Sequence, residues 1–106
     1  FMIKIKDVID LFKITESARS ILEGIILREK QFPNEELLVR LSMGIGWGGP
    51  KLNLSLEERK INGDLQFQFD GVNILIHEKD FVYFDYTKLD YVEDVLGKWS
   101  FTLLKI

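Results

Sequence analysis

Cysteine is missing from the 106 residues of the chain. Without cysteine these residues form no disulfide, offer no thiolate nucleophile and cannot hold zinc or an iron–sulfur cluster through sulfur. Histidine occurs only once, as His77, which excludes histidine relays and metal sites built from several histidines. The side chains that most often mark a thiol enzyme or a metal carrier are therefore lacking.

Long apolar runs and an excess of basic charge are lacking as well. With 14 Lys and Arg against 17 Asp and Glu, the net charge of −3 disfavours nucleic acid as a partner. No apolar run approaches the ~20 residues that a membrane span requires, and Lys4, Asp10 and Lys13 interrupt any signal-peptide core. We therefore expect no membrane or nucleic-acid partner and a cytoplasmic location, and we interpret Phe1, ahead of Met2, as a remnant of expression.

The residues that are present have the composition of an ordinary globular protein. Apolar residues make up 46% and charged residues 29%, which argues against disorder. A chain of 106 residues buries roughly two-thirds of its unfolded surface. Charge is spread evenly, without a repeat or a low-complexity segment, so we expect residues 1–106 to form a single domain.

One strong helix is predicted in the first third of the chain. Thr15 is a suitable N-cap, and Glu16 follows it in the first turn, where the helix dipole favours an acid. Pro33, within Phe32-Pro33-Asn34, is expected to stop the helix, and Gly24 is unfavourable inside it. The helical spacing predicts a buried stripe of Ala18, Ile21, Leu22, Ile25 and Ile26.

Residues 3–13, ahead of this helix, permit two interpretations. Ile3–Lys6 alternates apolar and basic residues in the manner of a strand. The apolar residues between Val8 and Phe12 have instead the spacing of a helical turn. The sequence leaves the conformation of this segment open.

From Leu37 onward the apolar period changes to two, which indicates half-buried antiparallel strands. Asp70-Gly71 is a strong hairpin signal between two of them, and Asp80–Tyr86 is expected to be a short helical turn. The predicted strands cover residues 37–43, 52–57, 65–69, 72–76, 89–92 and 99–103. The fold class is α+β: about six or seven short, mostly antiparallel strands packed with one main N-terminal helix.

The most unusual segment is the glycine-rich loop Gly44–Pro50. Its letters fit G-x-G-x-x-G, but a dinucleotide site needs a helix to begin there, and a period-two run, Lys51–Glu57, follows instead. We interpret the segment as a connection between two antiparallel strands, in which Trp47 either fills a core or faces a partner. The candidate partner-binding residues are Gly44, Gly46, Trp47, Gly48 and Gly49.

Other polar residues suggest little chemistry. His77, next to Glu78 at a strand end, is expected to be an ordinary surface residue. The spacing of Asp85, Asp90, Glu93 and Asp94 matches no calcium loop and favours turn and capping roles. We therefore expect no enzyme, catalytic residue, metal site or cofactor, and carboxylate chemistry of a hydrolase or isomerase around Asp85 and Asp90 is a minor alternative.

Three segments together resemble the HesB/IscA-like family of A-type iron–sulfur cluster assembly proteins. Ile14–Ala18 is similar to the I-T-x-S-A opening of that family's helix. Residues 39–57 resemble its strand, glycine–cysteine loop and returning strand, and residues 71–92 resemble its G-V-x-V-x-V and L-D-Y-V motifs. The resemblance covers most of the chain and implies the α+β fold of that family.

The same resemblance implies where a cluster would be held. The family binds iron or a [2Fe–2S] cluster through cysteines, one in the glycine loop and a pair in a C-terminal Cys-x-Cys. Trp47 stands at the loop cysteine position, and the residues up to Ile106 include no counterpart of the pair. Tryptophan offers an N–H donor and no available lone pair, so no family ligand carries over to this sequence.

Two functional hypotheses follow. The first is a cluster-free, non-catalytic member of the family that binds a protein partner or regulates iron–sulfur biogenesis. The second is a small-molecule or peptide-binding module that uses Gly44–Pro50 with Trp47 as an aromatic platform. The strand Trp99–Leu103 would also allow pairing with a second copy in a homodimer.

Overall fold

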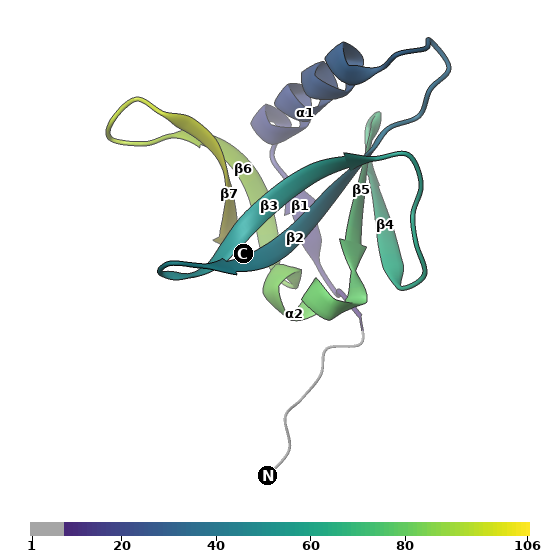
Figure 1. Ribbon diagram of the computed structural model, residues 1–106. Coiled ribbons are helices and arrows are strands. Elements are labelled where there is room, and N and C mark those ends of the chain that lie inside the picture. Colours follow the sequence, from purple (N-terminus) through teal and green to yellow (C-terminus); the bar gives the residue numbers. More distant parts are fainter. Residues whose placement is uncertain (1–7) are drawn as a thin grey trace.

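Two β-sheets, one long helix and a short helical segment make up the protein in a computed structural model that describes residues 8–106 (Figure 1). In chain order the elements are β1 (Phe12–Ile14), α1 (Glu16–Glu29), β2 (Leu38–Gly46), β3 (Gly49–Glu57), β4 (Asp64–Phe69), β5 (Val72–His77), the 3-10 turn η1 (Glu78–Asp80), α2 (Phe81–Phe84), β6 (Thr87–Glu93) and β7 (Trp99–Lys105). The predicted α+β class, with one main helix near the N-terminus and seven strands, is confirmed.

The segment ahead of α1 is not helical where it is described. Phe12 begins β1, which pairs with β6, so the helical turn considered between Val8 and Phe12 is wrong. The strand interpretation of Ile3–Lys6 lies outside the described residues.

Helix α1 begins as predicted, because the side chain of Thr15 accepts a 3.1 Å hydrogen bond from the Ala18 N–H. The helix ends at Glu29, ahead of the predicted stop at 32–34, and the N–H of Lys30 closes its last turn on Ile26. The buried face consists of Ala18, Leu22 and Ile26. Ile21, which was expected on that face, is exposed, so the buried stripe is narrower than the spacing predicted.

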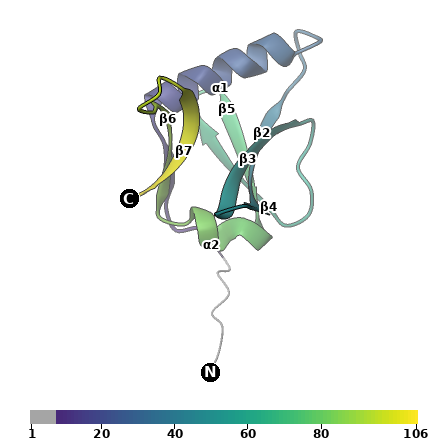
Figure 2. The ribbon, with the colours of Figure 1, turned by 60° about the vertical axis from the view of Figure 1, so that its left-hand side comes forward.

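The strands form a three-stranded sheet in the order β1-β6-β7 and a four-stranded sheet in the order β3-β2-β5-β4. The pairs β2–β3, β4–β5 and β6–β7 are antiparallel, as predicted, whereas β1–β6 and β2–β5 are parallel. A parallel pair needs a long connection between its two strands. Strands β3 and β4 form this connection between β2 and β5. Helix α1 crosses one end of the sheets and α2 lies at the other end (Figure 1 and Figure 2).

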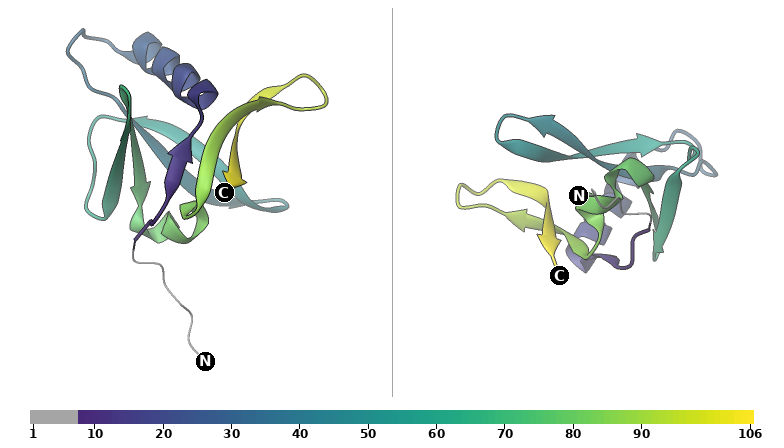
Figure 3. Two further views of the ribbon diagram at one scale, coloured as in Figure 1. Left: turned by 180° about the vertical axis from the view of Figure 1, so that it is seen from behind. Right: turned by 90° about the horizontal axis from the view of Figure 1, so that it is seen from below.

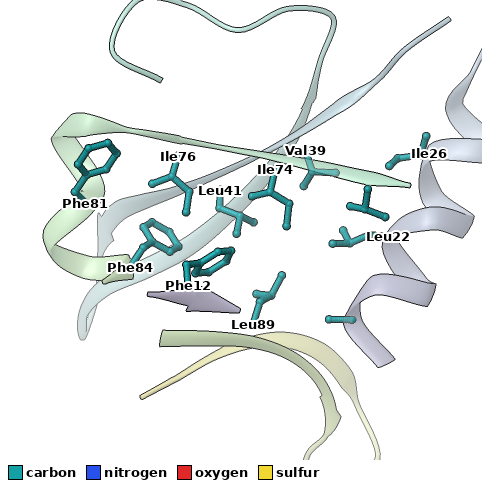
Figure 4. Close-up of a cluster of buried hydrophobic side chains, with 12 residues drawn as sticks. Phe12, Leu22, Ile26, Val39, Leu41, Ile74, Ile76, Phe81, Phe84 and Leu89 are labelled. Carbon is teal, nitrogen blue, oxygen red and sulfur yellow. The ribbon is translucent and has the colours of Figure 1, made fainter. Parts of the chain in front are cut away.

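The core fills the space between α1, α2 and the two sheets (Figure 4). Phe12 lies at its centre, with its ring centroid 5.3 Å from that of Phe67 and 6.2 Å from that of Phe84. The buried members are Phe12, Ala18, Leu22, Ile26, Val39, Leu41, Val72, Ile74, Ile76, Phe81, Phe84 and Leu89. One core thus receives side chains from both sheets and both helices.

Candidate functional site

The glycine-rich segment is the tip of a long hairpin and not a wide loop. Strands β2 and β3 pair as far as Gly46 opposite Gly49, which leaves only Trp47 and Gly48 as the turn. The predicted connection over Gly44–Pro50 is therefore too long, because five of its seven residues extend the strands. The hairpin projects away from the core (Figure 1).

Two of the glycines are required by the backbone of this turn. Gly48 has φ +92° and Gly49 has φ +112°, values that residues with a Cβ adopt only with strain. A positive φ at the second turn residue matches a type II turn. At Gly44 a Cβ would lie 2.6 Å from Nδ2 of Asn53, the end of a side chain on the paired strand, which would have to move aside. These glycines position Trp47 through the shape of the chain.

Trp47 is exposed and takes no part in the core. Its relative accessibility is 106%, and that of Ile45, two residues earlier on β2, is 93%. Ile45 continues the face of β2 that carries Leu41 and Met43 into the core, since successive odd positions lie on one side of a strand. An apolar face therefore runs from the core to the hairpin tip, where it ends in two uncovered side chains.

A second apolar tip was missed by the sequence analysis. The turn between β6 and β7 is held by Asp94, whose Oδ1 accepts hydrogen bonds of 2.8 Å from the Leu96 N–H and 2.9 Å from the Lys98 N–H. Val95 and Leu96 are both exposed on this ordered turn. Two adjacent apolar residues inside an Asp- and Gly-containing turn were the available signal.

The two tips project to the same side of the molecule (Figure 3). The face of β6–β7 that carries Leu89 into the core also bears aromatic rings: Tyr91 lies 4.8 Å from Phe101 and 5.6 Å from Trp99, measured between ring centroids. Trp99 is more than half exposed, and Tyr91 and Phe101 are half-buried. Exposed apolar or aromatic side chains are therefore present on both hairpins.

The carboxylates considered for catalysis serve the fold. Oδ1 of Asp85 accepts backbone hydrogen bonds of 2.7 Å from Asp10 and 3.2 Å from Leu11, and so fixes the chain ahead of β1. Oδ1 of Asp90 accepts the hydroxyl of Thr15 at 2.7 Å and the N–H of Tyr91 at 2.8 Å. The Thr15 bond, followed by the Tyr91 bond, lowers the pKa of Asp90 below its ordinary value. The predicted turn role is confirmed for Asp94, whereas Asp85 and Asp90 instead hold segments that are distant in sequence.

His77 has a structural contact as well. Its Nδ1 accepts a 3.2 Å hydrogen bond from the Lys79 N–H at the start of η1, and the residue is half-buried, less exposed than expected. It borders a cavity of about 310 Å³ together with Arg40, Ser42, Ile61, Lys79 and Asp80. Within residues 8–106, no three His, Cys, Asp or Glu side chains are grouped so that they could hold a metal ion.

Arg40 borders this cavity but is held by acids of its own sheet. Its Nη1 and Nη2 each donate a 2.7 Å hydrogen bond to the buried carboxylate of Asp64, and its Nε donates one of 3.1 Å to Glu57. These hydrogen bonds, donated by Arg40 and accepted by Asp64, lower the pKa of Asp64 and raise the pKa of Arg40. This ion pair ties β2 to the start of β4.

The residues at the tip do not fit an iron–sulfur cluster. Thiolate ligands are absent from the 106 residues, and Trp47 presents an indole N–H, which donates and does not ligate.

Helices long and apolar enough to cross a membrane are absent from the part of the chain that the structure describes.

Comparison with known proteins supplies relatives by sequence. No family model matches the chain. It is 33% identical over 84 residues to the iron-sulfur cluster insertion protein ErpA of Hydrogenovibrio crunogenus, covering 78% of this chain and 72% of that protein. It is also 29% identical over 87 residues to a protein of Aquifex aeolicus, covering 82% and 73% of the two chains.

Solved structures share the fold. The crystal structure of Escherichia coli SufA, described as involved in biosynthesis of iron-sulfur clusters, has a TM-score of 0.69 at 21% identity, over 86% of this chain and 76% of SufA. IscA with a [2Fe-2S] cluster gives 0.69 at 21% identity, over 90% and 82% of the two chains. The solution structure of a protein from Aquifex aeolicus gives 0.71 at 24% identity, over 99% and 100%.

Proposed function

The chain belongs to the HesB/IscA-like family of A-type iron–sulfur cluster assembly proteins, and we propose that it acts in the cytoplasm as a cluster-free, non-catalytic member that binds a protein partner. One observation carries the proposal. Trp47, which stands where the resemblance places the loop cysteine, is fully exposed at the tip of a hairpin. A position that would ligate a cluster in the family is occupied here by a residue suited to contact.

The shape of the tip favours a partner over a small molecule. Small-molecule sites are concave and bury most of their ligand. Trp47 instead lies in a turn of two residues and Ile45 lies just before it on β2, and each is at least nine-tenths exposed. Such side chains bury themselves best when they enter a pocket or groove on another protein, and tryptophan is enriched at the energetic centres of such interfaces. Under the second hypothesis, a binding module that uses Gly44–Pro50, the ligand would then be a peptide or a protein surface and not a small molecule.

A non-catalytic role is supported by how the polar groups are used. Oδ1 of Asp85 accepts a backbone hydrogen bond and Oδ1 of Asp90 accepts one from a hydroxyl. Arg40 is paired with Asp64 and Glu57. A catalytic acid or base needs a cleft and a substrate proton within reach. These groups instead join strands and segments far apart in sequence, which is a structural role.

Partner capture from the native host tests the proposal. Immobilised wild type, Trp47→Ala and Phe32→Ala are compared, since Phe32 is another exposed aromatic, on the connection between α1 and β2. We expect the same specific protein to be retained by wild type and Phe32→Ala and to be lost with Trp47→Ala. Equal retention by all three proteins would contradict a role for the tip.

A further inference from the structure

Residues 58–63, which connect β3 to β4, cross the face of the four-stranded sheet that is turned away from the core. Strands β3 and β4 both run antiparallel to the middle strands β2 and β5, so the chain has to return along the sheet before β4 begins (Figure 1). Arg40 of β2 and Leu75 of β5 are in register on this face, because their neighbours on each strand point into the core. Leu75 is fully buried although it is not part of the core cluster. The sheet and the crossing segment therefore enclose a space between them.

That space is a cavity of about 310 Å³ between the sheet, the connection and the end of β5. Its lining residues are Arg40, Ser42, Ile61, His77, Lys79 and Asp80. Small-molecule sites range from about 300 to 1,000 Å³, so a cavity at the lower end suits a ligand of amino-acid size and not a nucleotide. Apart from Ile61 the lining side chains are polar or charged, which indicates a ligand with several polar groups.

Asp80 gives this cavity a buried carboxylate that has no partner within residues 8–106. The residue is 4% exposed, and no hydrogen-bond donor of the described residues lies within reach of its Oδ2. Asp80 directly precedes α2, but its side chain makes no capping hydrogen bond to that helix. A buried carboxylate oxygen without a donor costs free energy, and folded proteins seldom contain one unless a ligand or an ordered water supplies the donor. The wall formed by Asp80 therefore suits a ligand that carries N–H or O–H donors.

Lys79 adds the opposite charge to the same cavity. Its side chain is exposed and forms no ion pair within the part of the chain that the structure describes. Arg40 also borders the cavity, but its charge is balanced by the carboxylates of Asp64 and Glu57. The charges left for a ligand are therefore one carboxylate, on Asp80, and one ammonium, on Lys79.

We propose that this cavity binds a small zwitterion of the free amino acid class, whose ammonium group meets Asp80 and whose carboxylate group meets Lys79 and Ser42. The ammonium supplies the donors that Oδ2 of Asp80 lacks, and charge-assisted hydrogen bonds of this kind are the strong ones. The Ser42 hydroxyl donates to the ligand's carboxylate, and Ile61 contacts its side chain. The site is separate from the hairpin tip, so it does not depend on the role given to Trp47.

The two charges select a zwitterion over simpler ligands. An amine alone would bring a second cation to Lys79, and a carboxylate alone would meet Asp80 in a buried setting, where like charges repel strongly. A metal ion lacks ligands, because within residues 8–106 no three His, Cys, Asp or Glu side chains are grouped to hold one. A free amino acid carries both charges on groups attached to one carbon and so matches both walls.

Free L-amino acids are the probe, and amide NMR spectra of the isotope-labelled full chain report their binding. We expect at least one standard amino acid, at millimolar concentration, to give saturable shifts at Ser42, Ile61 and Asp80. The corresponding acid, which lacks the ammonium, should bind at least ~10-fold more weakly, and the corresponding amine, which lacks the carboxylate, should also bind more weakly. A cavity that holds only water would show no saturable shift with any amino acid, and this result would overturn the proposal. Equally tight binding of the acid or the amine would overturn it as well.

Variants of the two neighbouring acids separate binding from structure. Asp80→Asn keeps the shape of the side chain and should weaken amino acid binding by at least ~10-fold, because the charge that meets the ammonium is lost. Its free energy of unfolding should not fall, since the carboxylate has no partner to lose among the described residues. Glu78→Gln is the matched control, because Glu78 is exposed in η1 and does not line the cavity, and it should bind as wild type does.

Lys79→Gln tests the other end of the ligand. Because Lys79 is exposed, we expect the variant to fold normally and to bind about 2- to 5-fold more weakly. Unchanged binding by Asp80→Asn, or equal weakening by Asp80→Asn and Glu78→Gln, would contradict the assignment of the site.

Discussion

The hydroxyl of Thr15 donates a 2.7 Å hydrogen bond to the carboxylate of Asp90, although the two residues are 75 positions apart in the chain. Thr15 belongs to the segment that resembles the family's helix opening, and Asp90 to the segment that resembles its L-D-Y-V motif. The same hydroxyl accepts the Ala18 N–H and so caps α1. One side chain therefore joins the start of the main helix to β6.

Replacing Thr15 by alanine removes both contacts. The helix then lacks its N-cap, and Asp90 lacks the hydroxyl that donates to it. We therefore expect Thr15→Ala to lower the free energy of unfolding by about 1–2 kcal/mol. Thr15→Ser keeps the hydroxyl and should cost much less. Urea denaturation measures both; an equal loss in the two variants would mean that the methyl group, and not the hydrogen bonds, matters.

The Arg40–Asp64 pair predicts a dependence of stability on pH. Arg40 holds the pKa of Asp64 below its ordinary value in the folded protein, and the unfolded chain binds a proton at this carboxylate more readily. The pair therefore stabilises the fold above about pH 4, and this contribution is lost as the pH falls through the folded pKa. We expect Asp64→Asn to cost about 2 kcal/mol at neutral pH and progressively less below about pH 4.

Urea titrations of wild type and Asp64→Asn at several pH values check this dependence. Glu57→Gln is the matched control, because Glu57 is more exposed and receives a single hydrogen bond from Arg40. Its cost should stay below about 1 kcal/mol. A cost of Asp64→Asn that does not change between neutral and acid pH would refute the assignment.

Two glycines should respond to alanine in opposite directions. Gly24 lies inside α1, and a Cβ there would meet nothing within 4 Å, so Gly24→Ala should stabilise the protein by about 0.5–1 kcal/mol. Gly48 has φ +92°, so Gly48→Ala should destabilise it by about 1–2 kcal/mol. Thermal unfolding compares the two variants, and a stabilised Gly48→Ala would be incompatible with the turn described.

Trp47 should contribute little to stability. Because its side chain is fully exposed, Trp47→Ala should change the free energy of unfolding by less than about 0.5 kcal/mol. Phe84→Ala, at a fully buried aromatic, should cost about 3–5 kcal/mol. Both values come from the same denaturation experiment. A large loss for Trp47→Ala would mean that the indole packs against the protein after all.

Local features could be predicted from the sequence more fully than long-range ones. The Thr15 cap and the Asp70-Gly71 turn, in which both residues have positive φ, each follow from the chemistry of a few neighbouring residues. Period two fixes the face of a strand and not its partner, so the parallel pairing of β2 with β5 could not be foreseen.

The candidate site shows the same limit. Glycine content predicted a turn near Trp47, but strand pairing decides how far the strands run, and here it leaves two residues for the turn. Whether Trp47 is exposed depends on which other parts of the fold lie near the hairpin tip. The residues next to Trp47 in the sequence do not contain that information. The apolar tip at Val95 and Leu96 was missed because the flanking strands were predicted without their turn.

Anaerobic reconstitution with iron and sulfide shows whether the protein can hold a cluster. After desalting, iron and acid-labile sulfide bound per chain are measured together with the visible absorption spectrum. Without thiolate ligands in these 106 residues, the protein should be colourless and retain iron and sulfide only at background. A stoichiometric iron content with a sulfide-to-iron charge-transfer band would contradict the account.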